Sequence, residues 1–534
     1  HADEFSHAVQ IGNAITEKRC LDAMLRARDH ADGCLYTATT DCGAGGLSSA
    51  VGEMGEQVGV AVELQDVPLK YAGLRYDEIW ISEAQERMVL AVPPDRLDRL
   101  MAIMAEEEVE ATVIGTFGHS DPDTGRPQLV VRYAGTVVGT LDMAFLHDGL
   151  PRRTREARWQ SSAPAAPPAP AAPAPPADVL AALERRLAGG NVTGKQWIIR
   201  RYDHEVQGGS VVKSLCGPGA GPSDAAVLRP RLGAAGGLAV GCGMVPTLSD
   251  VDPYWMAAAS IDEALRNVIA VGGDPTRTAI LDNFCWGRSD DAEQLGGLVR
   301  ACQACYDAAT VYGVPFISGK DSLNNEYALE AGDIETLAAV LTEYAARGDD
   351  AHGLTPEALP GVLAQVRRTG RLRIPATLLI SAISLIDDVA RCCTPDLKQP
   401  GAELWLVGGL PQVGFRLTAA YDVHTAVAQA LRAGHVAACH DVSDGGWLVA
   451  AAEMALAGIR GAELAGGAVG VGPFAPLVAG YVVETRHAAG LRGLCVRRGV
   501  TLTRLGVVRD DARLVVDGAA VPVEQLRAAW ALAR

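Results

Sequence analysis

Thr40-Asp41-Cys42-Gly43-Ala44-Gly45-Gly46-Leu47, near the start of the chain, returns near its end as His440-Asp441-Val442-Ser443-Asp444-Gly445-Gly446-Trp447. Asp, Gly and Gly recur at an offset of 400 residues (441 − 41), and Glu53-Met54 recurs at the same offset as Glu453-Met454. Each copy follows a short apolar segment with strand character and precedes a segment with helical spacing. Five matches in register predict a domain that occurs twice.

The residue types in this loop suit a phosphate and its counter-ion. Glycines let backbone N–H groups approach a ligand closely, and the start of the following helix favours an anion. A carboxylate at the end of the preceding strand is placed to hold Mg²⁺ against phosphate oxygens. A single copy is equally typical of a tight turn whose Asp only caps the helix. Two copies with the same downstream Glu-Met favour a ligand role for at least one of them.

Composition limits the class of protein. The chain has 534 residues, enough for three or four domains, and 49% of them are hydrophobic. Aromatic residues make up 5% and the net charge is −17, which argues against binding to nucleic acid but leaves ATP open through Mg²⁺. Twelve irregularly spaced cysteines do not form a disulfide framework, and no segment is long and apolar enough for a membrane span or a signal peptide. We therefore expect a cytoplasmic protein.

The chain divides at a run of Ala and Pro over 161–176, which cannot pack a core and is typical of an extended spacer. A second seam is a polar, helical stretch between the apolar segments 315–317 and 377–385, which we interpret as a helical insertion at a domain junction. The resulting domains are 1–155, a linker 156–180, 181–345, the insertion 346–370, and 371–534.

Two further motifs lie in the middle of the chain. Ser260-Ile261-Asp262-Glu263 has the pattern of a capping box that opens a helix, and Gly272-Gly273 would end that helix. The apolar strand after it, 278–281, would deliver Asp282 to its C-terminal end, where it contacts a nucleotide or metal, or else caps the next turn. A second apolar strand leads into Ser318-Gly319-Lys320-Asp321-Ser322, a set with cation, carboxylate and hydroxyl together but without Walker A spacing.

The segment Ile81-Ser82-Glu83-Ala84-Gln85-Glu86-Arg87-Met88 is polar and runs into an apolar strand. Glu83 and Gln85 can hydrogen-bond a substrate, and a charged strand start is the equally open alternative.

Together these motifs closely resemble the synthetase part of phosphoribosylformylglycinamidine synthases, the glutamine-dependent amidoligases of purine biosynthesis. The resemblance rests on Val9-Gln10-Ile11-Gly12, 41–47, 82–88, 201–208, Asp252-Pro253-Tyr254, 281–287, 318–326 and 440–446. It implies an α/β (α+β) fold of tandem, duplicated A and B domains of the aminoimidazole-ribonucleotide-synthetase type. The chain would hold the first B domain, the second A domain and the second B domain.

The resemblance also implies a reaction. ATP phosphorylates the formamide oxygen of formylglycinamide ribonucleotide, ammonia attacks the resulting iminophosphate, and phosphate leaves. ATP and Mg²⁺ are the implied cofactors, and no nucleic acid or membrane partner is expected. Because the chain shows no glutaminase motif, a separate glutaminase subunit and a small accessory subunit are implied.

Site residues are carried over position by position from the motifs. The implied substrate contacts are Gln10, Glu83, Ala84, Gln85 and Ser322, and the implied ATP contacts are Asp282, Gly319 and Lys320. The implied Mg²⁺ ligands are Asp41, Asp321, Asp441 and Asp444. Asp321 is included because a protonated Lys320 cannot bind a cation. The family's catalytic histidine is expected in a first A domain that would precede His1.

Two departures from the family pattern distinguish the copies. The segment of the last domain equivalent to 82–87 reads Ala475-Pro476-Leu477-Val478-Ala479-Gly480, without a polar side chain. Val245-Pro246-Thr247-Leu248 replaces the Asn-Pro-x-Tyr that is frequent there. We therefore expect the first loop to serve catalysis and the second to serve structure. The alternatives are a non-catalytic or incomplete fragment that acts as a scaffold, and another ATP-using superfamily member such as selenophosphate synthetase.

Overall fold

The computed structural model describes residues 9–10, 13–70, 72–84, 86–160, 175–201, 204–205, 208–346, 359–466 and 472–531. It divides into two compact units, His1–Thr154 and Arg155–Arg534, and each is described by itself. The Ala/Pro run that we interpret as a linker lies almost wholly outside the described residues. No helix of the described residues is long and apolar enough to cross a membrane.

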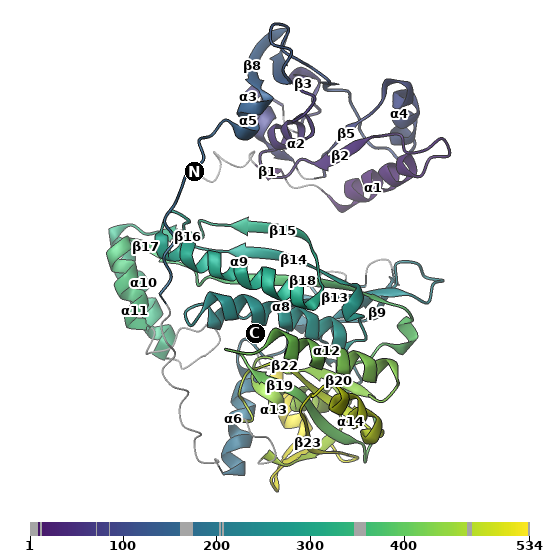
Figure 1. The fold of residues 1–534 in the computed structure, drawn as a ribbon, viewed down its shortest axis with the longest axis vertical. Coiled ribbons are helices and arrows are strands. Elements are labelled where there is room, and N and C mark those ends of the chain that lie inside the picture. Colours follow the sequence, from purple (N-terminus) through teal and green to yellow (C-terminus); the bar gives the residue numbers. More distant parts are fainter. Residues whose placement is uncertain are drawn as a thin grey trace. The chain divides into compact units, whose positions relative to one another are not determined.

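The first unit contains one copy of the repeated loop (Figure 1). Its helices and strands are β1 (Val9–Gln10), α1 (Ala14–Arg28), β2 (Ala38–Asp41), α2 (Leu47–Met54), β3 (Val60–Glu63), α3 (Tyr76–Ile81), β4 (Glu83–Ala84), β5 (Met88–Ala91), α4 (Leu97–Glu106), β6 (Gly115–Phe117), β7 (Gln128–Tyr133), β8 (Thr136–Asp142) and α5 (Met143–Asp148). Strands β6, β3, β7 and β8 form a four-stranded sheet, and β2 pairs with β5. The core beneath helix α2 is aliphatic, with Leu47, Val51, Val62 and Met143 all buried.

The C-terminal part of the second unit holds the other copy. Its elements are β19 (Glu403–Pro411), α12 (Leu417–Arg432), β20 (Ala438–Asp441), α13 (Gly446–Gly458), β21 (Gly461–Leu464), β22 (Leu477–Thr485), α14 (Ala488–Arg497), β23 (Leu502–Arg509), β24 (Arg513–Val516), β25 (Ala519–Pro522) and α15 (Val523–Trp530). The strands form one seven-stranded sheet in the order β20-β22-β19-β23-β21-β24-β25.

Strand pairing confirms the duplication. Strand β2 pairs antiparallel with β5, as β20 does with β22, so that Asp41 lies opposite Met88 and Asp441 opposite Tyr481. Strand β3 is antiparallel to β6 and parallel to β7, as β21 is to β23 and β24. The last pairs, β7 with β8 and β24 with β25, are both antiparallel. Each described ladder of the first copy beyond β1–β4 therefore has a counterpart in the second.

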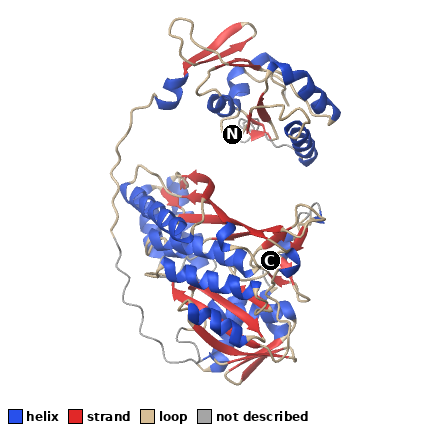
Figure 2. Ribbon diagram, turned by 45° about the vertical axis from the view of Figure 1, so that its right-hand side comes forward, coloured by secondary structure: helices blue, strands red, loops and turns tan. Residues whose placement is uncertain are grey.

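A different sheet forms the middle of the second unit, and two long helices lie on it (Figure 2). Its six strands are ordered β15 (Phe316–Ser322), β14 (Thr278–Cys285), β18 (Thr377–Ile386), β13 (Gly237–Gly243), β12 (Ala226–Leu228) and β9 (Ser210–Val212). Helices α8 (Pro253–Ala270) and α9 (Ala292–Tyr312) bury the side of the sheet that carries Ile280 and Ile380. Helix α8 also packs on β20 and β22, so the six- and seven-stranded layers share one core.

The expected boundary at residue 371 is wrong. Strand β18 pairs with β13 and β14, which places residues 377–386 in the same sheet as strands of the expected domain 181–345 and moves the start of the last domain beyond them. The helical insertion therefore interrupts the A-domain sheet instead of lying at a domain junction. It is a hairpin of α10 (Ala331–Ala346) and α11 (Leu359–Thr369) on a stem formed by β16 (Glu326–Ala328) and β17 (Arg371–Arg373).

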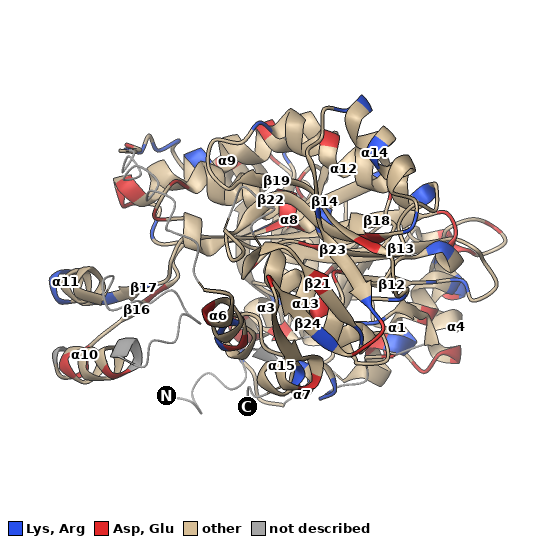
Figure 3. Cartoon of the chain, turned by 90° about the horizontal axis from the view of Figure 1, so that it is seen from below, with Lys and Arg blue, Asp and Glu red and all other residues tan. Residues whose placement is uncertain are grey.

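The two hairpin helices carry opposite charges, acidic on α10 and basic on α11 (Figure 3). Arg367 of α11 pairs with Glu335 of α10 at 3.3 Å. The remainder of the insertion, 347–358, lies outside the described residues.

The capping box expected at Ser260 is also wrong. Helix α8 begins seven residues earlier at Pro253, and Asp252 is its N-cap, with its carboxylate accepting from Tyr254 N at 2.9 Å. Ser260 lies inside the helix and donates to Met256 O at 2.9 Å. The expected end of the helix is confirmed, since α8 ends at Ala270, Val271 is its C-cap, and Gly272 follows with a φ of 108°.

Candidate functional site

The first copy of the loop presents an open carboxylate. Asp41 ends strand β2 and its side chain is exposed. Gly45 and Gly46 turn the chain with φ values of 85° and 58°, and helix α2 starts after Gly46 without any side-chain cap. Asp41 is therefore not a helix cap. Within the described residues its carboxylate has no hydrogen bond or ion pair, which leaves both oxygens for a ligand.

The polar segment that follows helix α3 lies directly against this loop. A Cβ on Gly46 would lie 2.2 Å from the Ser82 carbonyl oxygen, so only glycine allows this contact. Cys42 N donates to Arg87 O at 2.9 Å, and Arg87 Nη2 donates to Ser82 O at 2.8 Å. Burial is the main reason that the pKa of the Cys42 thiol is raised. The loop and the segment that carries Glu83 thus form one framework.

Strand β1 completes this part of the site. It is parallel to β4, with Val9 opposite Glu83 and Gln10 opposite Ala84. The structure therefore brings the backbones of Gln10, Glu83 and Ala84 side by side, next to the loop that begins at Asp41. The side chain of Gln10 and the whole of Gln85 lie outside what the structure describes.

The second copy has a closed carboxylate. Asp441 is 4% exposed, and Arg266 Nε of helix α8 lies 3.3 Å from its Oδ2. The same guanidinium pairs with Asp262 one turn earlier on α8. Asp262 in turn accepts from Ala479 N at 2.9 Å and lies 2.9 Å from His424 Nε2. Helix α13 begins without a side-chain cap, so Asp441 is not a cap either.

Asp224 joins the second loop from the six-stranded layer. Its Oδ1 accepts from Asp441 N at 2.9 Å and lies 2.7 Å from His440 Nδ1, while His440 Nε2 lies 3.2 Å from Glu453 Oε2. Because both ring nitrogens face carboxylates, the pKa of His440 is raised well above its usual range despite its burial. The other oxygen, Asp224 Oδ2, is buried and has no hydrogen-bond partner among the described residues.

A cavity of about 470 Å³ opens over these groups, lined by polar residues of both layers that include Lys195, Ser223, Asp224, Asn267, His440, Asp441, Ser443, Asp444 and Glu453. Side-chain atoms of Asp224, His440 and Asp441 lie within 4.8 Å of one another. Because both ring nitrogens of His440 already face carboxylates, the two aspartates are the groups that can ligate a cation. Asp444 lines the cavity, and desolvation raises its pKa. An oxygen-rich, roomy site with one orphaned carboxylate oxygen fits a hard divalent cation.

Two buried carboxyl groups at or near this cavity have raised pKa values. Burial raises the pKa of Glu263 to about 8, and the nearby Asp441 adds to the effect. Burial also raises the pKa of Asp441 to about 6, with the adjacent Asp224 opposing the guanidinium of Arg266. Asp224 and Asp441 lie close together here, and a bound cation would relieve the repulsion between them.

The nucleotide residues expected in the second A domain divide between two faces of the sheet. Asp282 lies inside β14, not at its tip, and pairs in register with Gly319 of the edge strand β15. A Cβ on Gly319 would lie 2.7 Å from Asp282 Oδ1, so glycine makes room for this carboxylate. Asp321 shares this face, whereas Lys320 and Ser322 alternate to the other, where Lys320 Nζ donates to Ser322 Oγ at 3.0 Å.

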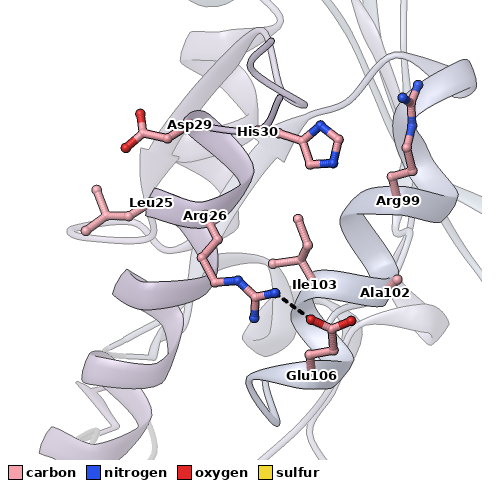
Figure 4. A pocket seen from close by; sticks show the side chains of 8 residues that line it. All are labelled: Leu25, Arg26, Asp29, His30, Arg99, Ala102, Ile103 and Glu106. Atoms are coloured by element: carbon pink, nitrogen blue, oxygen red, sulfur yellow. Dashed lines mark hydrogen bonds and ion pairs between the residues drawn. The ribbon is translucent and has the colours of Figure 1, made fainter. Parts of the chain in front are cut away.

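A second hollow, of about 610 Å³, lies on the first unit between α1 and α4 (Figure 4). Its cations are already engaged: Arg26 contacts Glu106 and Glu107, and Arg99 contacts Asp32. Such solvated ion pairs are typical of a protein surface, and we assign this hollow no ligand.

Sequence reasoning missed Asp224, Glu263, Arg266 and His440 as parts of the second site. One signal was available for the residues of α8, since Asp262 and Arg266 are charged, lie four residues apart, and interrupt the apolar face of a helix. No comparable signal marks Asp224, because its partner lies 216 residues away in the chain.

Comparisons with known proteins agree with this architecture. A family model described as AIR synthase related protein, C-terminal domain, matches residues 1–125 and 402–476, and the corresponding N-terminal domain model matches 222–337. Phosphoribosylformylglycinamidine synthase subunit PurL of Acidiphilium cryptum is 32% identical over 557 residues, which cover 99% of this chain and 67% of that relative. The same subunit of a Bradyrhizobium strain is 29% identical, over 98% and 67%.

Solved structures show the same fold. Thermotoga maritima PurL complexed with ADP has a TM-score of 0.62 at 19% identity and covers 93% of this chain, which spans 68% of that protein. The complex with FGAR has a TM-score of 0.59 at 19% identity, with 94% of this chain and 66% of that protein covered. The chain thus spans about two thirds of the length of these proteins.

Proposed function

Because this chain belongs to the phosphoribosylformylglycinamidine synthase PurL family, whose members are ATP-dependent enzymes of purine biosynthesis, we propose that its first loop binds substrate and Mg²⁺ for that reaction. Formylglycinamide ribonucleotide, ATP and ammonia give formylglycinamidine ribonucleotide, ADP and phosphate. The observation that carries the proposal is the exposed carboxylate of Asp41, which has no partner among the described residues, beside the segment of Glu83 and Ala84.

In this reaction the formamide oxygen must first be converted into a leaving group. The formamide oxygen attacks the γ-phosphorus of ATP, the bond from that phosphorus to the bridging oxygen breaks, and ADP departs. Ammonia then adds to the imidate carbon and phosphate leaves with the former formamide oxygen. The enzyme's contribution is to orient these groups and to offset the developing charge. Mg²⁺, when bound, would neutralise charge on the phosphates.

Each residue of the first copy has a proposed part. Asp41 would hold Mg²⁺, because both of its oxygens are open at the end of a strand. Gly45 and Gly46 would let the backbone approach an anion at the start of α2. Gln10, Glu83, Ala84 and Gln85 would contact the ribonucleotide. Arg87 would act indirectly, since it ties the Ser82 carbonyl to this loop.

In the second A domain, Asp282, Gly319 and Asp321 would face ATP or its cation from one side of the sheet. Lys320, which the sequence predicts as an ATP contact, lies with Ser322 on the other side of the sheet, and we propose that both serve the substrate phosphate there. The proposed ATP contacts and the proposed substrate contacts of this domain therefore lie on opposite faces of the six-stranded sheet.

The cavity of the second copy would bind a cation with a polyphosphate in a supporting role. The sequence predicts Asp441 and Asp444 as its ligands, and the geometry adds Asp224 to the proposed set. Lys195 supplies a cation on the cavity wall, where its ammonium donates to Gly190 O at 2.9 Å. A separate glutaminase subunit and a small accessory subunit remain the proposed partners, in keeping with the solved structure of PurLQS from Thermotoga maritima, whose fold this chain shares.

Two measurements test the proposal. The first titrates the chain with formylglycinamide ribonucleotide in the presence of Mg²⁺ and a non-hydrolysable ATP analogue by calorimetry. Binding that disappears in Asp41→Ala, with an unchanged circular dichroism spectrum, supports the assignment. Binding that persists unchanged in this variant would sink it. The second follows ADP by a coupled assay with ribonucleotide, ATP, Mg²⁺ and ammonium, and ADP release that does not depend on the ribonucleotide argues for another ATP-using activity.

A further inference from the structure

The last helix of each duplicated domain carries the same apolar stripe, and only one stripe is covered. Met143, Leu146 and Leu150 in the first copy correspond to Val523, Leu526 and Trp530 in the second at an offset of 380 (523 − 143). The spacing i, i+3, i+7 puts all three side chains of the second copy on one side of α15. In the first copy Met143 and Leu146 lie on α5, and Leu150 directly follows its C-cap, Gly149.

Helix α6 (Pro176–Ala188) covers the stripe in the second copy. It packs on α15, β25 and α13, and its own stripe of Leu180, Leu183 and Leu187 is buried in the same core as Leu526 and Trp530. Leu526 is 0% exposed and Trp530 2%. Polar contacts at the edge fix the helix in place, with Gln525 Nε2 donating to Glu184 Oε1 at 2.8 Å.

In the first copy the equivalent apolar side chains are exposed to solvent. Leu146 is 40% exposed and Leu150 83%, although Met143 at the root of the stripe is 1% exposed. Phe145, which stands where Gln525 meets α6, is 61% exposed. Helix α2 continues the face, because a Cβ on Gly52 would lie 3.5 Å from Leu146 Cδ2. Phe145 and Leu146 on α5 and Leu150 just after it are large, apolar and exposed together, which exceeds the scattered exposure expected of a surface.

We propose that the α2–α5 face of the first copy is a docking site for an amphipathic helix of the α6 kind, with leucines at i, i+3 and i+7 and basic residues beside them. The occupant is inferred from the second copy, where the equivalent face of the same domain seats such a helix. The two helices of this face carry exposed carboxylates, Glu53 on α2 and Asp148 on α5, and α6 carries Arg185 and Arg186 in its last turn. An aromatic at position 145 enlarges the apolar contact that the helix would cover.

The probe is a synthetic peptide with the sequence of residues 176–188, labelled with fluorescein and titrated with the full 534-residue chain. Fluorescence anisotropy should show saturable binding. Leu146→Asp together with Leu150→Asp should weaken it at least tenfold, because a carboxylate then replaces each apolar contact. Ile15→Asp, at an equally exposed apolar position on α1, is the matched control and should leave binding unchanged. A peptide with Ser at the three leucines should not bind.

The binding position of the peptide is determined by photocrosslinking, with a benzophenone in place of Leu183 of the peptide. Crosslinks to residues 143–150 are expected. Crosslinks confined to 523–530 would mean that the peptide only displaces the chain's own α6, and would overturn the proposal. Absence of binding would overturn it too, since it would mean that another part of the chain covers the face or that nothing docks there. Circular dichroism checks that the two Asp variants fold as the parent does.

Discussion

Arg266 and Asp441 form a buried ion pair, with 3.3 Å between Nε and Oδ2, that joins helix α8 of the six-stranded layer to strand β20 of the seven-stranded layer. Arg266→Met should lower the free energy of unfolding of the second unit by about 3–5 kcal/mol, because it leaves Asp262 and Asp441 buried without their cation. Urea denaturation followed by far-ultraviolet dichroism measures this. The exposed pair Arg504–Glu403 is the control, and Arg504→Met should cost no more than about 1 kcal/mol. Equal effects would refute the distinction.

Removing the charge of Asp41 should affect ligand binding, whereas removing the charge of Asp441 should affect stability. Asp41→Asn should weaken binding of the ribonucleotide at least tenfold and leave stability within about 0.5 kcal/mol, because the carboxylate is exposed and unpartnered in the described structure. Asp441→Asn should instead lower stability, since it removes the charge that Arg266 faces. Calorimetric titration measures ribonucleotide binding, and thermal denaturation measures stability, in both variants. The prediction fails if Asp441→Asn weakens binding while Asp41→Asn unfolds the chain.

Gly46 should tolerate no side chain. Its φ is 58° and a Cβ would lie 2.2 Å from the backbone oxygen of Ser82, so Gly46→Ala must move the segment that carries Glu83. Gly33→Ala provides a matched control, since Gly33 has a φ of 91° with nothing within 4 Å of the added carbon. Both variants bear the cost of a left-handed residue, about 1–2 kcal/mol. Only Gly46→Ala should in addition lose ribonucleotide binding, measured by calorimetry.

Glu484 should make stability depend on pH. Its carboxylate accepts from Lys398 N and Gln399 N, both at 2.8 Å, and desolvation nevertheless raises its pKa above the ordinary value. The folded state therefore holds this proton more tightly than the unfolded chain does. The free energy of unfolding should fall as pH rises from the ordinary glutamate pKa, about 4.3, through the folded pKa, with a slope of at most about 1.4 kcal/mol per pH unit.

Glu484→Gln should remove that part of the slope. Urea denaturation at a series of pH values measures it, and a parallel curve for the variant and the parent would contradict the prediction.

The helical hairpin should be dispensable for the sheet that it interrupts. Its two ends meet at the stem, where Leu329 N donates to Gly370 O at 2.9 Å and Glu326 to Ala328 pair with Arg371 to Arg373. Replacing residues 331–369 by a short Gly-Ser turn should keep the melting temperature within about 5 °C and leave ADP binding unchanged. Thermal denaturation and calorimetry test this. Loss of the cooperative transition would show that α10 and α11 belong to the core.

Features encoded in neighbouring residues could be predicted from the sequence, whereas the pairing of distant strands could not. The repeated loop and its flanking strand and helix are written in contiguous residues, so the duplication could be predicted and the ladders confirm it. Strand β18 belongs with β13, more than a hundred residues earlier, and only the pairing shows that it extends the A-domain sheet. Asp282 illustrates the same limit, because an apolar run of four residues does not reveal that the strand continues through the polar positions after it.

The site shows a similar division. The first loop could be proposed from sequence because its functional groups stand in one short motif. The second depends on Asp224, Arg266 and His440 meeting from three elements, and an isolated acidic or basic residue carries no sign of a partner two hundred positions away.

The ion pair between Arg266 and Asp441 also affects how the sequences of the two copies can change during evolution. Arg266 and Asp441 constrain each other, so a change at either is harmful until the other changes, and the pair can be lost only through a weakened intermediate. Asp41 has no such tie within the described chain, and folding alone would let it vary freely. A library of variants selected only for folding should therefore retain Asp441 and scatter Asp41, and one selected for growth without supplied purine should retain both.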